Sequence, residues 1–123
     1  MTTEHLFLVG PMGAGKSTIG KQLANILGRP FFDIDVEIVK STGADIQWIF
    51  DMEGEEGFRQ RESAMLLRTI ASSTPSVIAT GGGIVLRSDN RNAMVDAGKV
   101  VYLWVTKQQL YERTERDRSG LYC

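Results

Sequence analysis

A glycine-rich motif near the N-terminus, residues 10–17, reads Gly-Pro-Met-Gly-Ala-Gly-Lys-Ser and matches the phosphate-binding pattern G-x-x-x-x-G-K-[S/T]. An apolar segment at residues 6–9 precedes it, and apolar residues at helical spacing follow it over residues 16–27, where Gly28 ends the pattern. A strand that leads through such a turn into a helix directs backbone N–H groups and the positive helix end at phosphate oxygens. The motif predicts a strand–loop–helix unit that binds a nucleoside triphosphate. The alternative is a glycine-rich turn with an incidental lysine.

Apolar strands and helices alternate along the rest of the chain. We expect further strands at residues 30–34, 77–79 and 100–105, and helices at 36–41, 55–71, 87–97 and 107–118, with a short helix capped by Asp45 before Gly54. Alternation of this kind predicts an α/β fold in which helices cover both faces of an open parallel sheet. Residues 1–123 are long enough for a single domain with a core of its own.

Bulk composition excludes several classes of function. The formal net charge of −1 gives no electrostatic case for nucleic acid as a partner, and no apolar run is long enough for a membrane span. The N-terminus lacks the basic start and apolar stretch of a signal peptide, so a cytoplasmic location is expected. Cys123 is the only cysteine, and the only histidine, His5, is expected in a mobile N-terminal segment. Disulfides, thiolate clusters and imidazole-based chemistry are therefore not expected.

Two carboxylates, Asp33 and Asp35, fall at the end of the second expected strand. Near a triphosphate they suit orientation of Mg²⁺ and acceptance of a proton from an attacking hydroxyl. The alternative is that one aspartate only caps the following helix.

Three further groups of residues suit a binding site. Arg59 and Glu62 share a helix face, so a glutamate-held arginine can clamp a substrate carboxylate; an ordinary surface ion pair is the alternative. The glycines Gly81, Gly82 and Gly83 allow close approach of a small ligand, or form a plain turn. The arginines at 113, 116 and 118 can meet phosphates or complement a helix dipole. Trp48 and Trp104 are expected in the core.

Taken in order, these motifs closely resemble those of bacterial shikimate kinases, which phosphorylate shikimate in aromatic amino-acid biosynthesis. The matching segments are residues 10–18, the Asp33/Asp35 pair, Gly-Ala-Asp at 43–45, Glu-Gly-Glu-Glu-Gly-Phe-Arg at 53–59 with Arg-Glu at 61–62, and Ala-Thr-Gly-Gly-Gly at 79–83. The resemblance implies a P-loop NTPase-like three-layer α/β/α fold. It also implies ATP and shikimate as substrates, Mg²⁺ as cofactor and a monomeric full-length protein.

The resemblance further implies a role for each site residue. ATP is held by the loop residues and by an arginine on the adenine: Gly13, Ala14, Gly15, Lys16, Ser17, Thr18 and Arg113. Mg²⁺ is bound by Ser17 and Asp33, and Lys16, Asp33 and Asp35 take part in catalysis. Shikimate is bound by Asp35 as the candidate base, by Arg59 held by Glu62, and by the loop Gly81, Gly82 and Gly83.

The C-terminal residues depart from the family pattern. Counted by family spacing from Arg113, a lid arginine is expected at position 120, where this chain has Gly120. The resemblance places a second substrate-carboxylate arginine, a fifth strand, a final helix and part of the adenine pocket outside this chain, so we expect residues 119–123 to be a truncated or out-of-frame tail. Impaired or lost activity and self-association through the edge of the strand at 100–105 are the expected consequences. A nucleotide-binding remnant without catalysis, or another P-loop kinase such as a gluconate kinase, are the alternative interpretations.

Overall fold

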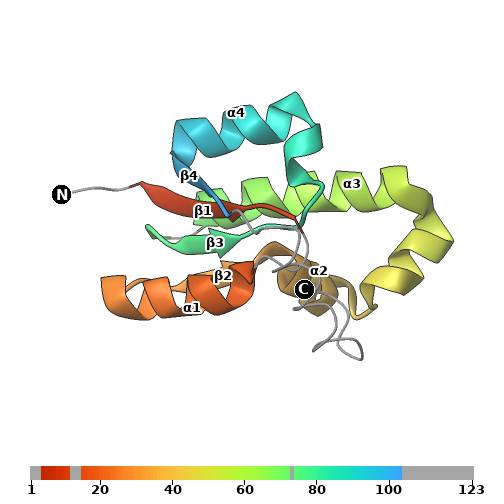
Figure 1. Ribbon diagram of the computed structural model, residues 1–123. Helices are drawn as coiled ribbons and strands as arrows, with labels where there is room; N and C mark the ends of the chain where they lie inside the picture. The colour runs from red at the N-terminus through yellow and green to blue at the C-terminus, as the bar shows by residue number, and fades with distance from the viewer. Residues whose placement is uncertain (1–3, 12–14, 73, 104–123) are drawn as a thin grey trace, which may run out of the picture.

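The computed structural model describes residues 4–11, 15–72 and 74–103, and Figure 1 shows their arrangement. The strands are β1 (His5–Val9), β2 (Phe31–Asp33), β3 (Val77–Ala79) and β4 (Gly98–Tyr102). The helices are α1 (Lys16–Leu27), α2 (Ile34–Thr42), α3 (Ile46–Ser72) and α4 (Ser88–Ala97), with a short 3-10 helix, η1 (Ile84–Leu86). The expected alternation of strands and helices is confirmed over these residues.

The four strands form one parallel sheet in the order β2-β3-β1-β4. In the central strand, Phe7 pairs with Ile78 of β3 on one side and with Val100 of β4 on the other. Because all strands run the same way, the segments that leave β1, β2 and β3 meet at one edge of the sheet. This edge therefore receives the phosphate-binding loop, Asp33 and the glycines after β3.

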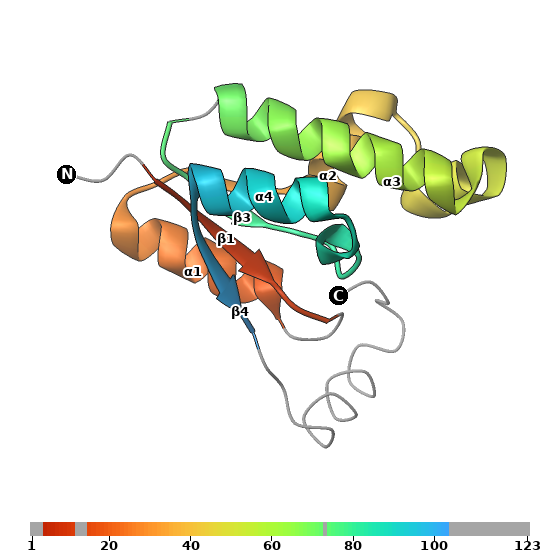
Figure 2. The ribbon, with the colours of Figure 1, turned by 90° about the horizontal axis from the view of Figure 1, so that it is seen from above.

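Two apolar cores lie on opposite faces of the sheet, as Figure 2 shows, with α3 and α4 over one face and α1 over the other. The larger core joins strand residues such as Phe7 and Ile78 to the helices α2, α3 and α4, and the smaller core packs Leu8 and Val77 against α1. Side chains of successive strand residues point to opposite faces of the sheet. Because helices cover both faces, successive residues of a strand are both apolar. The three-layer α/β/α fold is confirmed.

Gly20 shows how closely α1 packs on the sheet. A Cβ atom there would overlap the Phe31 ring, reaching within 3.1 Å of Cδ1 and closer still to Cε1. A glycine in a helix interior costs about 1 kcal/mol relative to alanine, and here it is the residue that fits.

Three sequence expectations are wrong in detail. β2 ends at Asp33, and Asp35 lies in the first turn of α2 because the Asp33 side chain caps that helix. Trp48 is 51% exposed on α3, since Ile49 and Phe50 provide the buried face of that turn. His5 lies buried in β1, where its Nδ1 accepts a hydrogen bond from the Ser76 backbone N–H at 3.1 Å.

The expected break at Gly54 is confirmed: its φ of 75° and ψ of 177° interrupt α3. Asp45 also caps the first part of α3, accepting a hydrogen bond from the Trp48 N–H at 2.8 Å. Trp104, the expected helix 107–118 and the tail with Gly120 lie outside the described residues. Among the helices of the described part of the chain, none is both long and apolar enough to span a membrane.

Candidate active site

The phosphate-binding loop leaves β1 and returns as α1, whose first residue is Lys16. Gly15 precedes the helix in the left-handed region, with φ of 81°, which a glycine adopts without strain. The largely buried Lys16 ammonium donates hydrogen bonds to the carbonyls of Gly10 at 2.6 Å and Pro11 at 3.0 Å. The ammonium is thus held by the two residues that directly follow β1. Gly13 and Ala14 lie outside the described residues.

Asp33 has two roles at the end of β2. Its Oδ2 atom accepts a hydrogen bond of 2.5 Å from the Ser17 hydroxyl, and its Oδ1 atom accepts bonds from the N–H groups of Asp35 at 3.0 Å and Val36 at 3.3 Å. The capping role is therefore confirmed for Oδ1, and Oδ2 binds the Ser17 hydroxyl, while metal binding by Asp33 stays a prediction.

Ser17 and Asp33 together offer hard oxygen atoms of the kind that Mg²⁺ binds, and Ser17 follows Lys16 in the first turn of α1. Mg²⁺ usually takes only one or two protein ligands and completes its shell with water and substrate phosphates. In the described part of the chain, no cluster of three acidic, histidine or cysteine residues offers a metal site. The Ser17–Asp33 pair is thus suited to a metal that arrives with a nucleotide.

Asp35 lies beneath the glycine loop. A Cβ atom on Gly81 would lie 3.2 and 3.3 Å from its two carboxylate oxygens, so the absence of a side chain at 81 leaves the carboxylate room. Burial, followed by repulsion from Asp33 and Glu62, raises the pKa of Asp35 to about 6, although Lys16 and Arg59 act in the opposite direction. Its Oδ1 atom is buried and has no hydrogen-bond partner among the described residues. Such a carboxylate is suited to accept a proton near neutral pH.

Arg59 and Glu62 form the expected ion pair, with 3.0 Å between Nη1 and Oε1. Glu62 is only 1% exposed, and burial raises its pKa although the Arg59 hydrogen bond and charge oppose this shift. The guanidinium also lies over the Phe58 ring, with Cζ at 5.4 Å from its centroid. This burial contradicts the alternative of an ordinary solvated surface pair.

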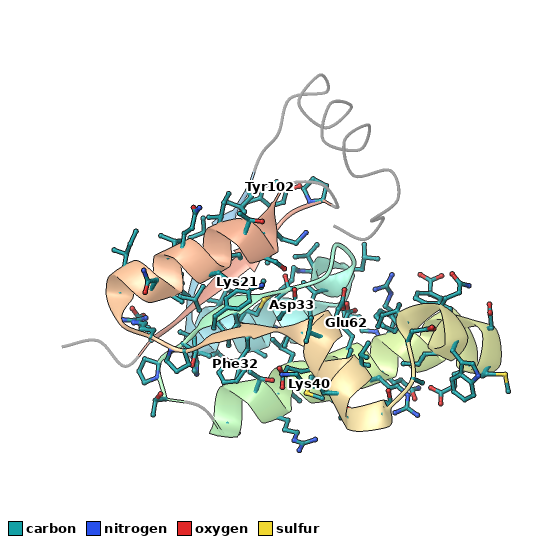
Figure 3. All side chains as sticks on the ribbon, turned by 90° about the horizontal axis from the view of Figure 1, so that it is seen from below. Lys21, Phe32, Asp33, Lys40, Glu62 and Tyr102 are labelled. Atoms are coloured by element: carbon teal, nitrogen blue, oxygen red, sulfur yellow. The ribbon has the colours of Figure 1, made fainter. Side chains whose placement is uncertain are left out.

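The glycine loop after β3 touches both polar groups. A Cβ atom on Gly83 would overlap the Arg59 guanidinium, and a Cβ atom on Gly81 would lie 3.0 Å from Glu62 Oε2. Gly82 is exposed between them. Figure 3 shows Asp33 and Glu62 at the same end of the sheet, and Asp35 interacts electrostatically with both.

The structure thus gathers the described candidate residues at one edge of the sheet, and Thr18, next to Ser17 in the first turn of α1, is exposed there. Arg113 lies outside the described residues. Sequence reasoning missed Arg87, which pairs with Glu56 at 2.5 Å and lowers the pKa of Glu62. It precedes α4, 31 residues from Glu56, so no local pattern points to it.

The parallel sheet with a phosphate-binding loop after its central strand defines a P-loop NTPase-like protein. A family model described as shikimate kinase matches residues 12–121. The chain belongs to the shikimate kinase family.

Curated relatives and solved structures agree with this assignment. The shikimate kinases of Histophilus somni and Chromohalobacter salexigens are 53% and 59% identical over 94% and 93% of this chain, and over 66% and 63% of their own lengths. The structure of Acinetobacter baumannii shikimate kinase in complex with shikimate matches with a TM-score of 0.88 at 46% identity, covering 98% of this chain and 66% of that one. A gluconokinase from Sinorhizobium meliloti, TM-score 0.63 at 19% identity, shares the fold. The chain thus spans about two thirds of the length of these shikimate kinases.

Proposed function

We propose that the protein transfers the γ-phosphoryl group of ATP to the 3-hydroxyl of shikimate. One observation carries the proposal: the glycine loop has a half-buried carboxylate, Asp35, beside Gly81 and a half-buried guanidinium, Arg59, beside Gly83. A small hydroxy acid bound along this loop can place its hydroxyl at Asp35 and its carboxylate at Arg59. Family membership and the shikimate complex of the Acinetobacter relative support shikimate as this hydroxy acid.

In the proposed reaction, the shikimate oxygen forms a bond to the γ-phosphorus while the bond from that phosphorus to the β–γ bridging oxygen breaks. The hydroxyl proton passes to Asp35, and ADP leaves. Lys16 and the loop backbone bind the phosphates, and Arg59, held by Glu62, orients the shikimate carboxylate. Mg²⁺ bound through Ser17 and Asp33 would neutralise phosphate charge. Positioning and charge neutralisation account for most catalysis in this class of reaction.

The first experiment is a coupled assay of ADP release with ATP, Mg²⁺ and shikimate, beside a Lys16→Ala control. Shikimate-dependent turnover that disappears in the control supports the proposal. If a folded chain gives no turnover, titration with ADP and with shikimate separates a binding-only protein from one that lacks the site. Gluconate in place of shikimate tests the alternative substrate. The likeness of this chain to the gluconokinase supports a shared fold alone.

Two accompanying proposals concern the chain's surroundings. A cytoplasmic location follows from the use of ATP. Self-association through β4 is proposed because this strand pairs only with β1 in the described sheet, and Val100, Val101 and Tyr102 stay partly exposed. Size-exclusion chromatography with light scattering over a range of concentrations tests this, since a constant monomer mass contradicts it.

A further inference from the structure

The helix that carries Arg59 folds back on itself before it reaches the site. Gly54, with φ of 75°, divides α3 into a first part at residues 46–53 and a second part at 55–72, and Figures 1 and 2 show the bend at the end of the molecule far from the N-terminus. A non-glycine residue rarely adopts this backbone conformation. The direction of the second part, and so of Arg59, depends on what holds this bend.

Two contacts between residues eight positions apart hold it. The Phe50 and Phe58 rings stack with centroids 4.7 Å apart. Arg61 donates two hydrogen bonds to Glu53, from Nε to Oε1 at 2.6 Å and from Nη2 to Oε2 at 2.7 Å. In a straight helix, positions i and i+8 are about 12 Å apart along the axis, so this two-pronged pair exists only because the helix bends.

Gly57 adapts the second part of α3 to the same contact. A Cβ atom on Gly57 would lie 2.6 Å from the Cβ of Glu53, closer than such atoms approach, and 3.4 Å from its Oε1. A glycine inside a helix is less favourable than an alanine. The close packing of Glu53 against Gly57 explains why a glycine occupies this position.

The bend leads directly to the site. Glu55, the first residue after Gly54, places its Oε2 atom 3.6 Å from Arg59 Nη2. Phe58, stacked on Phe50, lies under the Arg59 guanidinium. Of the groups around Arg59, Phe58 is therefore the one that a contact across the bend holds directly.

We propose that Glu53 is a positioning residue: its two-pronged pair with Arg61 across the Gly54 bend holds Arg59 in the orientation that receives the substrate carboxylate. The inference rests on the proposed function, because it takes shikimate as the ligand of Arg59. Glu53 touches neither substrate in this proposal, and it acts through Arg61, the bend and Arg59.

The test compares Glu53→Ala with Asp51→Ala by calorimetric titration of shikimate and, separately, of ADP. Asp51 is a matched control, because it lies on the same exposed part of α3, carries the same charge and, among the described residues, accepts a side-chain hydrogen bond only from Gln47, at 2.9 Å. Alanine at 53 keeps the Cβ that rests on Gly57. Exposed ion pairs contribute little, so we expect Glu53→Ala to raise the shikimate Kd only about two- to fivefold. ADP affinity, and both affinities of the control, stay unchanged.

A second set of variants distinguishes positioning from a general effect. Arg61→Leu removes the other partner, so it gives the same rise in shikimate Kd, and the Glu53→Ala/Arg61→Leu double variant adds nothing further. Equal shikimate affinities for Glu53→Ala and Asp51→Ala overturn the inference, as do additive effects or a matching loss of ADP binding. An Arg59→Ala protein that binds shikimate as the unmodified chain does would instead overturn the proposed function.

Discussion

Replacing Arg59 with methionine tests how much the ion pair between Arg59 and Glu62 contributes to the free energy of unfolding. Glu62 is 1% exposed, and Arg59 is the partner that its Oε1 atom binds, at 3.0 Å. Removing one member of a buried ion pair costs about 3–5 kcal/mol, because the other charge is left in a low-dielectric interior. We expect about 3 kcal/mol here, since the Arg59 side chain is already 19% exposed and Glu62 can bind a proton.

The comparison variant is Arg59→Met/Glu62→Met, which replaces the pair with two apolar side chains of similar length. Urea denaturation at pH 7 should place the double variant within about 1 kcal/mol of the unmodified chain and well above the single variant. Neither variant should bind shikimate, so the double variant separates stability from binding.

The pH dependence supplies a further check on the single variant. Without Arg59, burial still raises the folded-state pKa of Glu62 above the unfolded value, while the charge of Arg87 acts in the opposite direction, so the folded state binds more protons. The stability this gives is present below the unfolded pKa and lost as pH rises through the folded pKa. The deficit of Arg59→Met should therefore be smaller at pH 5 than at pH 8. Equal stability of single and double variants, or a deficit independent of pH, would refute the reasoning.

Four other outcomes are expected. Gly83→Ala should displace the Arg59 guanidinium and raise the shikimate Kd at least about tenfold, about 1.4 kcal/mol, with ADP affinity unchanged in calorimetry. Because Asp35 must be ionised to accept a proton and its pKa is about 6, kcat/KM for shikimate should fall as pH drops below about 6, and a flat profile would exclude it as the base. Ser17→Ala should weaken ADP binding in Mg²⁺ but not in EDTA, which titrations in both buffers compare. Gly20→Ala should cost about 1–3 kcal/mol of unfolding free energy through overlap with the Phe31 ring, and a more stable variant would contradict the packing.

The sequence predicted the fold through signals that are local. The motif at residues 10–17 fixed the first strand–loop–helix unit, and glycines marked the ends of α1 and α2, where Gly28 and Gly43 adopt left-handed conformations. Asp45 and Gly54 likewise act within a few residues of their positions. Trp48 was misplaced because a short amphipathic helix does not reveal from its sequence alone which apolar residues reach the core.

The candidate site was predicted as a set of residue types and not as an arrangement. Arg59 and Glu62 are three positions apart, so their pairing was readable from helix geometry. Asp35 and the glycine loop each follow an expected strand, and the carboxyl ends of parallel strands meet at one edge, so their closeness was also readable from the sequence. Family resemblance added the role of each residue. Contacts such as Arg87 with Glu56, or His5 with Ser76, join residues 31 and 71 positions apart, and no local pattern encodes them.

The sequence by itself determined the parallel α/β class, the phosphate-binding loop and the chemical groups available to it, because periodicity and turn chemistry act over short stretches of chain. Only the tertiary structure decided the strand order β2-β3-β1-β4, which places the loops after β2, β3 and β1 next to one another along one edge of the sheet. Only the structure gave Asp35 its burial and Glu62 its near-complete exclusion from water, and burial is what shifts their pKa values. Burial and charge proximity are sums over neighbours from distant segments, so they exist only once the chain has folded.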